Sequence, residues 1–334
     1  IPEEYGGGGL GVTEASIVEY EISASGGGMN ACSAVHIGIF GFDPIIRHGS
    51  EQLKQRFLPR VPTGDLHISF AVTEPDAGTD TTGITTFAKK VDGGFRVSGK
   101  KVWITKAQEA ERMLVLVRTT KREDCVKRTD GMTLLFAEMD PNHVQVREIP
   151  KMGRNAVNTN EVFIDDLFVA DEDVVGEVGK GFRTLLTGLN AERIVAANAA
   201  LGIGRAAVRR ATAYAKDREV FGRPIGQNQA IAHPLAEAQM RLDAAELMVY
   251  KAAWLLDNGY ECGPEANMGK FLAADAAFFA ADRALQTHGG FGYGKEFHVE
   301  RYFREARLKR IAPISQEMVL NYLSEHVLGL PRSY

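Results

Sequence analysis

The chain has 334 residues, of which 45% are hydrophobic and 25% charged, with a formal net charge of −4. This balance is ordinary for a globular protein with room for two or three domains, and it argues against a nucleic-acid binder. The three cysteines, Cys32, Cys125 and Cys262, lie far apart, so we expect reduced thiols and neither a disulfide framework nor a zinc site. No run approaches the roughly 20 apolar residues of a membrane span, and no signal peptide is visible. Because the chain opens at Ile1 without Met, we expect a fragment or a processed product.

The first part of the chain, residues 1–69, mixes Gly-rich loops with helical pieces. A helix is predicted from about Ser50, which is a good N-cap, to just before Pro59, which cannot continue it. The run GGGGLG at 6–11 fits the dinucleotide-binding pattern G-x-G-x-x-G. That pattern requires a preceding strand, which the sequence does not indicate, so we interpret the run as a plain Gly-rich loop.

Residues 70–172 have the pattern of an all-β domain, for which we expect a barrel or a sandwich. Short runs rich in Val, Thr and aromatic residues alternate or form apolar stretches between Gly, Asp and Pro. The predicted strands are GFRVSGKKVWIT (94–105), MLVLVRT (113–119), MTLLFAEM (132–139), VQVREI (144–149) and EVFIDD (161–166).

Residues 173–334 are dominated by Ala-rich helical patterns. Three long helices are predicted within 193–218, 233–259 and 267–290, and Gly residues end the last two. Ala-rich helices pack closely, so this part is predicted to be a four-helix-type bundle. The predicted fold is therefore a multidomain α+β protein: a helical N-terminal domain truncated at its start, a β domain and a helical bundle.

Two stretches of the β domain are candidates for ligand binding. In FAVTEPDAGTD (70–80), Thr73 and Thr79 lie in a turn-rich loop whose N–H groups can donate to an anionic or carbonyl-rich ligand. In KKVWIT (100–105), Trp103 and Thr105 fall on one strand face, where a ring and a hydroxyl group can hold a planar heterocycle. Ordinary structure explains each stretch equally well, as a self-capped β-turn and as a core Trp beside a Thr.

Other patterns are less specific. The eight histidines form no HExxH motif or Cys/His cluster, so metal catalysis is not expected. The charge-rich stretch HVERYFREARLKR (298–310) is interpreted as a solvated helix or a subunit contact in preference to a phosphate site.

Taken together and in this order, the stretches resemble the acyl-CoA dehydrogenase family over the whole chain. VTEPDAGTD looks like the family's VTEP-x-AGSD, with Thr79 in place of Ser, and GKKVWIT is similar to GxKxWIT. DREVFGRPIGQNQAI resembles RxxFGxxIxxxQ, QTHGGFGY resembles QxxGGxGY, and MGRNAVNTNEVFIDDLFV resembles the segment that closes the family's β domain. The resemblance implies a helical, β and helical architecture, FAD as the cofactor and usually a homotetramer.

The resemblance also implies roles for individual residues. Thr73 would hydrogen-bond the pyrimidine edge of the flavin, Trp103 would lie against its ring, and Thr105 would donate towards N5. Thr79 would lie near the cofactor and face the pantetheine of the substrate. Further cofactor contacts are implied for Gln316 and, towards the FAD of a neighbouring subunit, for Arg218, Phe221, Gln229, Gln286 and Gly290.

The family's reaction needs a carboxylate near the α carbon of the substrate, and the usual one is missing. In most members the base is the Glu of a YEGTSQ-like segment, and the matching stretch here is IAPISQ (311–316), with Ala312 at the Glu position. Ala312 cannot take a proton, although the resemblance implies that its backbone N–H still serves the thioester oxygen. Glu317 lies five residues beyond Ala312 and is one alternative base.

Glu192, in GLNAERIVAA (188–197), is the expected base. Read as a helix, this segment places Glu192 on an apolar stripe, where desolvation should raise its pKa towards neutral pH. Arg193 points about 100° away and cannot simply neutralise it. The resemblance agrees, because isovaleryl-CoA and long-chain members carry their base on this helix before an Arg, and Asn190 and Arg193 match residues that face CoA. A purely structural role for Glu192 is the alternative.

The expected function is FAD-dependent α,β-dehydrogenation of an acyl-CoA thioester, with electrons passed to an electron-transfer flavoprotein. A homotetramer or a homodimer is expected, with no nucleic acid, metal or membrane span. The alternatives are a flavin monooxygenase, an acyl-CoA oxidase, and a non-catalytic subunit that binds FAD or CoA. A bacterial cytoplasmic location is expected, and the mitochondrial matrix stays open because the N-terminus is missing. The acyl chain length is not predicted.

Overall fold

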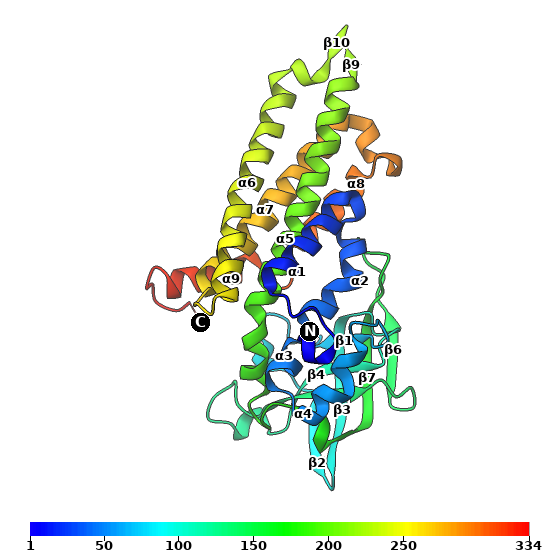
Figure 1. Ribbon diagram of the computed structural model, residues 1–334, viewed down its shortest axis with the longest axis vertical. Coiled ribbons are helices and arrows are strands. Elements are labelled where there is room, and N and C mark those ends of the chain that lie inside the picture. Colours follow the sequence, from blue (N-terminus) through cyan, green and yellow to red (C-terminus); the bar gives the residue numbers. More distant parts are fainter. Residues whose placement is uncertain (334) are drawn as a thin grey trace. The chain divides into compact units, whose positions relative to one another are not determined.

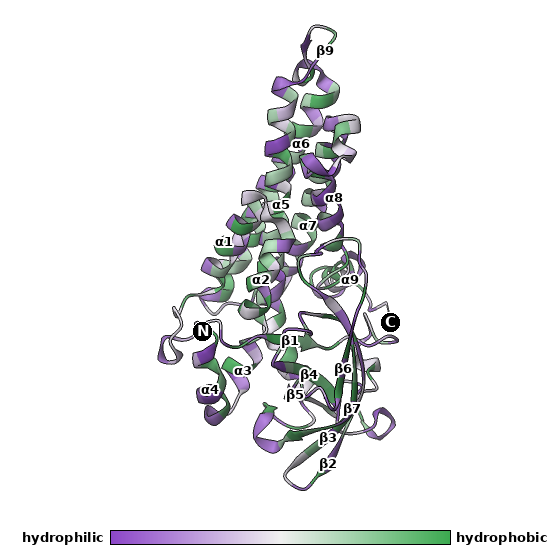
Figure 2. Ribbon diagram, turned by 90° about the vertical axis from the view of Figure 1, so that its right-hand side faces the viewer, coloured by the Kyte–Doolittle hydropathy of each residue, from purple (hydrophilic) through white to green (hydrophobic). Residues whose placement is uncertain are grey.

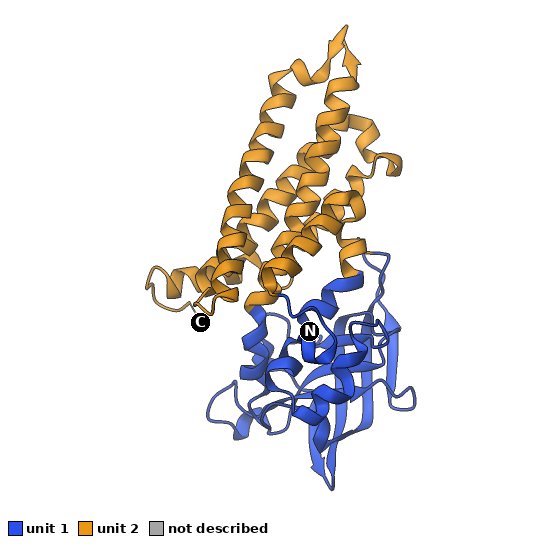
Figure 3. Cartoon of the chain, viewed as in Figure 1, with its two compact units in different colours: residues 1–10, 34–151, 155–189 blue, residues 11–33, 152–154, 190–334 orange. Residues whose placement is uncertain are grey.

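The computed structural model describes residues 1–333, which form two compact units (Figure 3). Unit 1 comprises residues 1–10, 34–151 and 155–189, and the described part of unit 2 comprises residues 11–33, 152–154 and 190–333. Along the chain, helices come first, then a β-sheet, then long helices, which confirms the expected fold class.

The N-terminal helices are short. α1 is Val12–Ile22, α2 is Gly28–Phe40, α3 is Asp43–His48 and α4 is Glu51–Phe57. As predicted, Ser50 caps α4, because its Oγ accepts from the backbone N–H of Leu53 at 3.1 Å. A single 3-10 turn, Glu3–Tyr5, precedes the GGGGLG run, so the dinucleotide pattern lacks its strand in the structure as well.

One sheet of eight strands forms the centre of unit 1 (Figure 1). Its path is β6-β7-β3-β2-β4-β5-β8, and β1 pairs in parallel with β4. Alternate side chains of β4 and β5 enter two different apolar cores, which is why both strands are continuously apolar. The sequence did not predict β1, β2 and β8. The bounds are β1 Ile68–Ala71, β2 Phe87–Val91, β3 Gly94–Thr105, β4 Arg112–Arg118, β5 Met132–Glu138, β6 Val144–Glu148, β7 Thr159–Ala170 and β8 Val174–Val175.

Long helices dominate unit 2. α5 (Gly181–Asp217) continues from unit 1 into unit 2, and a short hairpin of β9 (Glu219–Val220) and β10 (Arg223–Pro224) follows it. Buried Ala side chains line the contacts of these helices, which allows close packing, and hydrophobic residues are spread along them (Figure 2). The remaining helices are α6 Gln229–Asp257, α7 Gly263–His288, α8 Val299–Leu308 and α9 Gln316–His326.

The charge-rich helix α8 is not simply solvated, in contrast to the sequence interpretation. Glu305 is 1% exposed and accepts from the backbone N–H of Met29 at 2.7 Å and from the Asn30 amide. Arg301 donates to the same carboxylate. Because these donors satisfy Glu305 inside unit 2, a charged side chain tolerates burial that the sequence pattern does not reveal.

Among the described residues, one helical stretch, Val12–His48, is long and apolar enough to cross a membrane by length and composition alone. Half of its apolar window is buried inside the protein, and its backbone turns at Gly26, where φ is 107°. These features are typical of helices that pack in a protein core.

Candidate active site

In unit 1, a buried ion pair fixes the loop after β1 to strand β3. Lys101 has no exposed surface, and its Nζ donates to Glu74 Oε1 at 2.8 Å and to the Val72 carbonyl at 3.0 Å. Glu74 also accepts from the backbone N–H groups of Thr85 and Thr86, at 2.6 and 3.0 Å. Burial lowers the pKa of Lys101 to about 8, and the negative charge of Glu74 acts in the opposite direction. Because both charges are paired and hydrogen-bonded, the loop is held in one position.

This attachment places Thr73 beside Trp103. The Thr73 carbonyl accepts from the backbone N–H of Val102 at 2.9 Å. Val102 and Ile104 are buried, whereas Trp103 is 58% exposed and Thr105 partly exposed. Trp103 also has a φ of 65°, which bulky residues rarely adopt, next to a β-bulge in β3. An exposed indole on a strained backbone, beside two threonines, is suited to receive a planar heteroaromatic ring.

A buried arginine fixes the chain that follows Thr79. Arg118, at the end of β4, is 3% exposed and donates to four backbone carbonyl groups at 2.6 to 3.1 Å. One guanidinium therefore ties two loops together, and Thr79 lies exposed at the start of one of them. The four carbonyls belong to Thr82, Ile84, Arg128 and Asp130.

In unit 2, Glu192 lies on α5, and burial raises the pKa of its carboxyl group to about 7, as the sequence predicted in direction. The residue is partly buried, so its carboxyl group is desolvated although part of the residue's surface is still accessible. The positive charges of Arg193 and Lys309 act in the opposite direction and limit the rise of the pKa. Arg193 Nη1 donates to Asn190 Oδ1 at 2.9 Å, one turn earlier on the helix. A carboxyl group with a pKa near neutrality is suited to take up a proton.

Glu317, the alternative base, has a different environment. It is exposed in the first turn of α9, where hydrogen bonds from its own backbone and from Ser315 lower its pKa. At neutral pH such a carboxylate binds a proton less readily than Glu192.

The backbone N–H of Ala312, which is expected to serve the thioester oxygen, has a partner within the chain. It donates to the Leu308 carbonyl at 2.9 Å, in the turn that follows α8. The expected role of this donor towards a thioester oxygen stays a prediction.

Gln316, for which a cofactor contact is expected and stays a prediction, has a buried side chain with partners in unit 2. The side chain is 5% exposed, its Nε2 donates to the Phe271 carbonyl at 3.2 Å, and its Oε1 accepts from Lys270 at 3.2 Å. Lys270 donates to the carbonyl of Ile314 as well. Both ends of the Gln316 amide are engaged within unit 2, so the residue supports the segment before α9.

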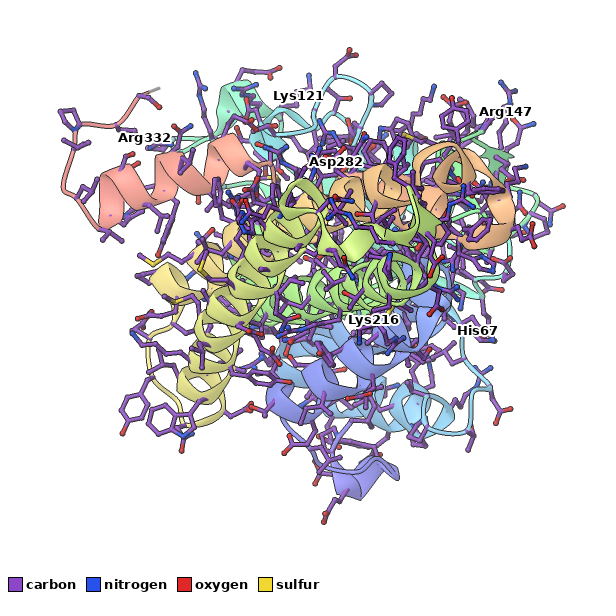
Figure 4. The ribbon with its side chains drawn as sticks, turned by 90° about the horizontal axis from the view of Figure 1, so that it is seen from above. His67, Lys121, Arg147, Lys216, Asp282 and Arg332 are labelled. Carbon is purple, nitrogen blue, oxygen red and sulfur yellow. The ribbon has the colours of Figure 1, made fainter. Side chains whose placement is uncertain are left out.

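The residues expected to hold the FAD of a neighbouring subunit are all exposed, and they gather at one end of unit 2. This is the end where α5 leads into the β9–β10 hairpin (Figure 1); Figure 4 looks at it from above and labels Lys216 near the end of α5. Phe221 occupies the hairpin turn, is fully exposed and has a φ of 54°. The Arg218 guanidinium lies 5.8 Å from the ring centre of Phe291, so two distant sequence motifs meet here. Among the described residues, no heavy atom comes within 4 Å of a Cβ built on Gly290. The set is Arg218, Phe221, Gln229, Gln286 and Gly290.

Sequence reasoning missed the residues that support the site, namely Lys101, Glu74 and Arg118. Regular strand alternation gives no signal for Lys101, because it would place Lys101 and Trp103 on the same face; the β-bulge between Lys101 and Ile104 buries Lys101 while Trp103 is exposed. Within residues 1–333, no group of His, Cys, Asp and Glu side chains is arranged to hold a metal ion.

Comparison with known proteins places the whole chain in one family. Family models for the N-terminal, middle and C-terminal domains of acyl-CoA dehydrogenases match residues 1–65, 69–167 and 179–328. The acyl-CoA dehydrogenase FadE12 of Mycobacterium tuberculosis is 39% identical over 336 residues, which cover 100% of this chain and 85% of that protein. The structure of butyryl-CoA dehydrogenase from Megasphaera elsdenii matches with a TM-score of 0.91 and 31% identity, over 98% of this chain and 85% of that one. An FAD complex of PigA matches with a TM-score of 0.92 and 25% identity, over 98% and 85% of the two chains. The chain therefore belongs to the acyl-CoA dehydrogenase family, FAD-dependent oxidoreductases that act on acyl-CoA thioesters.

Proposed function

We propose that the protein removes one hydrogen from each of the α and β carbons of an acyl-CoA thioester, forming the trans-2-enoyl-CoA, with Glu192 as the base. The environment of Glu192 carries the proposal. Its carboxyl group is desolvated on α5 with a pKa of about 7, whereas Ala312 has no titratable group and Glu317 is exposed with a lowered pKa. Near neutral pH, Glu192 is partly ionised and ready to accept a proton, which matches the need of general-base catalysis.

The residues of unit 1 fit a bound FAD, which supplies the acceptor for the hydride that leaves the β carbon. Trp103 offers its exposed ring to the flavin, with Thr73 and Thr105 as hydrogen-bonding neighbours. The Lys101–Glu74 pair holds this set in position, since it fixes the chain on both sides of Thr73. In unit 2, Arg193 and Asn190 form a hydrogen-bonded pair that orients the CoA thioester next to Glu192.

The first experiment mixes the FAD-loaded protein anaerobically with short, branched, long and cyclic acyl-CoA thioesters and follows flavin absorbance. We expect one class to bleach the flavin and to yield the trans-2-enoyl-CoA. Glu192→Gln should bind FAD and the same thioester but bleach at least a hundredfold more slowly, because general-base catalysis typically contributes that much.

Glu317→Gln is the matched control, since it removes the other carboxylate near this segment and should bleach at the wild-type rate. If Glu192→Gln bleaches normally and Glu317→Gln does not, the base is Glu317. If neither wild type nor variant bleaches with any thioester, the dehydrogenation itself is refuted, and the flavin monooxygenase and the non-catalytic subunit become the better functions.

We also propose an electron-transfer flavoprotein as the acceptor and a homotetrameric or homodimeric assembly. The exposed Phe221 and Arg218, together with the open approach to Gly290, support a neighbouring subunit at the hairpin end of unit 2.

Oxygen consumption during turnover separates the oxidase from the dehydrogenase, because only an oxidase passes both electrons to oxygen directly.

A further inference from the structure

Lys309 is a buried lysine that lacks a partner in the described part of the chain. It follows the last turn of α8 and is 5% exposed, yet its ammonium group makes no hydrogen bond and no ion pair with a described residue. Among the described residues, the two other buried lysines both have partners: Lys101 donates to Glu74, and Lys270 donates to Gln316. Because a buried charge without a partner is costly, the burial of Lys309 calls for a partner outside the chain.

A second cation, Arg154, belongs to the same cluster in unit 2. Burial, and then the positive charge of Arg154, lower the pKa of Lys309 to about 8. Arg154 has a φ of 57°, which is unusual for a long side chain, and its Nε and Nη2 donate to Ser33 Oγ at 2.9 and 2.6 Å. Ser33 is buried, so a neutral hydroxyl group and not a carboxylate holds this guanidinium. Strained backbone of this kind often occurs where a ligand binds.

The acidic groups around Lys309 do not pair with it. Glu305 lies one turn earlier on α8, and its carboxylate is engaged by donors from α2 and by Arg301. The negative charges of Glu19 and Glu192 oppose the lowering of the Lys309 pKa, but no described contact joins either carboxylate to its ammonium group. Glu192 is also only partly ionised near neutral pH. The cluster therefore offers a cation to a further anion.

The position of Glu192 indicates which anion reaches Lys309. In the proposed reaction Glu192 takes a proton from the α carbon, so the acyl group lies beside α5. Lys309 and Glu192 shift each other's pKa, so the ammonium group lies within electrostatic reach of that carbon. The phosphates of CoA lie on the other side of the thioester, beyond the pantetheine arm. The anion nearest to Lys309 is therefore a carboxylate at the far end of the acyl chain, which an ammonium and a guanidinium group are suited to bind.

We propose that Lys309, with Arg154 beside it, binds a carboxylate at the end of the acyl chain, and that the preferred substrates are ω-carboxyacyl-CoA thioesters. The inference rests on the proposed function, because the place of the acyl group is taken from Glu192. Lys309 acts as a specificity residue. Its charge gains a partner when such a thioester binds, whereas a plain fatty acyl chain buries the ammonium group further without one.

The binding of matched CoA thioesters tests this proposal. The members of each pair have equal chain length and differ in a terminal carboxylate: succinyl and butyryl, glutaryl and pentanoyl, adipyl and hexanoyl. Calorimetry on the FAD-loaded Glu192→Gln protein gives the dissociation constants, since a protein without the base binds these thioesters with little reaction. In at least one pair, the carboxylate member should bind more tightly by about tenfold or more, the effect of one charge-assisted hydrogen bond.

Lys309→Met, added to the same protein, should abolish this preference while the plain thioester binds as before or more tightly. Arg310→Met is the matched control. It removes the next cation in the chain, which is partly exposed and whose Nη2 lies 3.4 Å from Asp275 Oδ1, and it should leave the preference intact. The Lys309→Met protein should resist urea at least as well as its parent, because it loses a buried charge that has no partner.

The proposal is overturned if no pair favours its carboxylate member, or if Lys309→Met leaves the preference unchanged. A free anion as the partner of Lys309 would give no preference within any pair. Sodium chloride or acetate would then stabilise the parent protein against heat but not the Lys309→Met protein, and this result also overturns the proposal.

Flavin bleaching by the wild-type protein, with Glu192 intact, measures the chemistry separately. Bleaching by a plain thioester, together with equal binding within every pair, would keep the dehydrogenation and refute the carboxylate site. A binding preference that Lys309→Met abolishes, without bleaching by any thioester, would keep the carboxylate site and refute the dehydrogenation.

Discussion

Replacing Glu192 by Gln should stabilise the protein at alkaline pH while it abolishes proton abstraction. The carboxyl group has an ordinary pKa of 4.5 and a folded-state value of about 7. The folded state therefore holds the proton more tightly than the unfolded state, and stability falls as pH rises from about 4.5 through about 7. With roughly 1.4 kcal/mol for each pKa unit, the ionised carboxylate costs about 3 kcal/mol above pH 7. Gln has the same shape and does not ionise, so the variant avoids this cost.

The assay is urea unfolding of wild type and Glu192→Gln between pH 5 and pH 9. The difference in the free energy of unfolding should be small at pH 5 and should grow to about 3 kcal/mol at pH 8. Lys309, whose pKa burial lowers to about 8, titrates in both proteins, so its contribution largely cancels in the difference. In parallel, wild-type kcat/KM should rise with pH through about 7 as the base ionises.

Parallel stability profiles for the two proteins would refute the reasoning, because they would mean that Glu192 ionises in the folded state as it does in water. A constant offset without pH dependence would point to the same conclusion and would assign the offset to packing. Glu317→Gln should show no growing gain above pH 5, since the pKa of Glu317 is lowered and not raised.

Three further changes test the supporting structure. Lys101→Met leaves Glu74 buried without its cation and should destabilise the protein by about 3 to 5 kcal/mol in urea unfolding; adding Glu74→Gln should recover part of the loss, and a loss below about 1 kcal/mol would contradict the buried pair. Trp103→Ala should change stability by less than about 0.5 kcal/mol, because the side chain is exposed, but should weaken FAD binding about tenfold or more, as measured by flavin fluorescence titration; unchanged affinity would remove Trp103 from the flavin site. Ser50→Ala removes the cap of α4 and should lower the free energy of unfolding by about 1 kcal/mol. Ser50→Gly should recover most of this loss.

Local patterns predicted the elements of the fold that depend on local causes. The cap at Ser50, the long strand at 94–105 and the three Ala-rich helices are set by nearby residues, and the structure has all of them. The raised pKa of Glu192 was also predictable, because an apolar stripe on a helix implies burial without knowledge of the neighbouring elements.

Features that depend on distant partners were not predictable in the same way. Strand β2 pairs with β3 and β4, but its own sequence, FAKKV, is short and two adjacent lysines interrupt the apolar pattern that would indicate a strand. The burial of Glu305 depends on donors from α2, about 275 residues away in the chain. The partner of the Ala312 backbone N–H was not predictable either, since the turn after α8 decides it and motif similarity does not specify that turn.

The environment of Glu192 shows how a catalytic base can be carried by a helix instead of a loop. Burial alone would raise its pKa until the carboxyl group stayed protonated at neutral pH and could not act as a base. Arg193 and Lys309 oppose that rise, and neither forms a direct ion pair with Glu192 among the described contacts, so they lower the pKa without capturing the carboxylate. Lys309 is 5% exposed, and its charge is therefore poorly screened by solvent. The pKa of Glu192 therefore stays near neutrality, because burial raises it while the positive charges of Arg193 and Lys309 lower it.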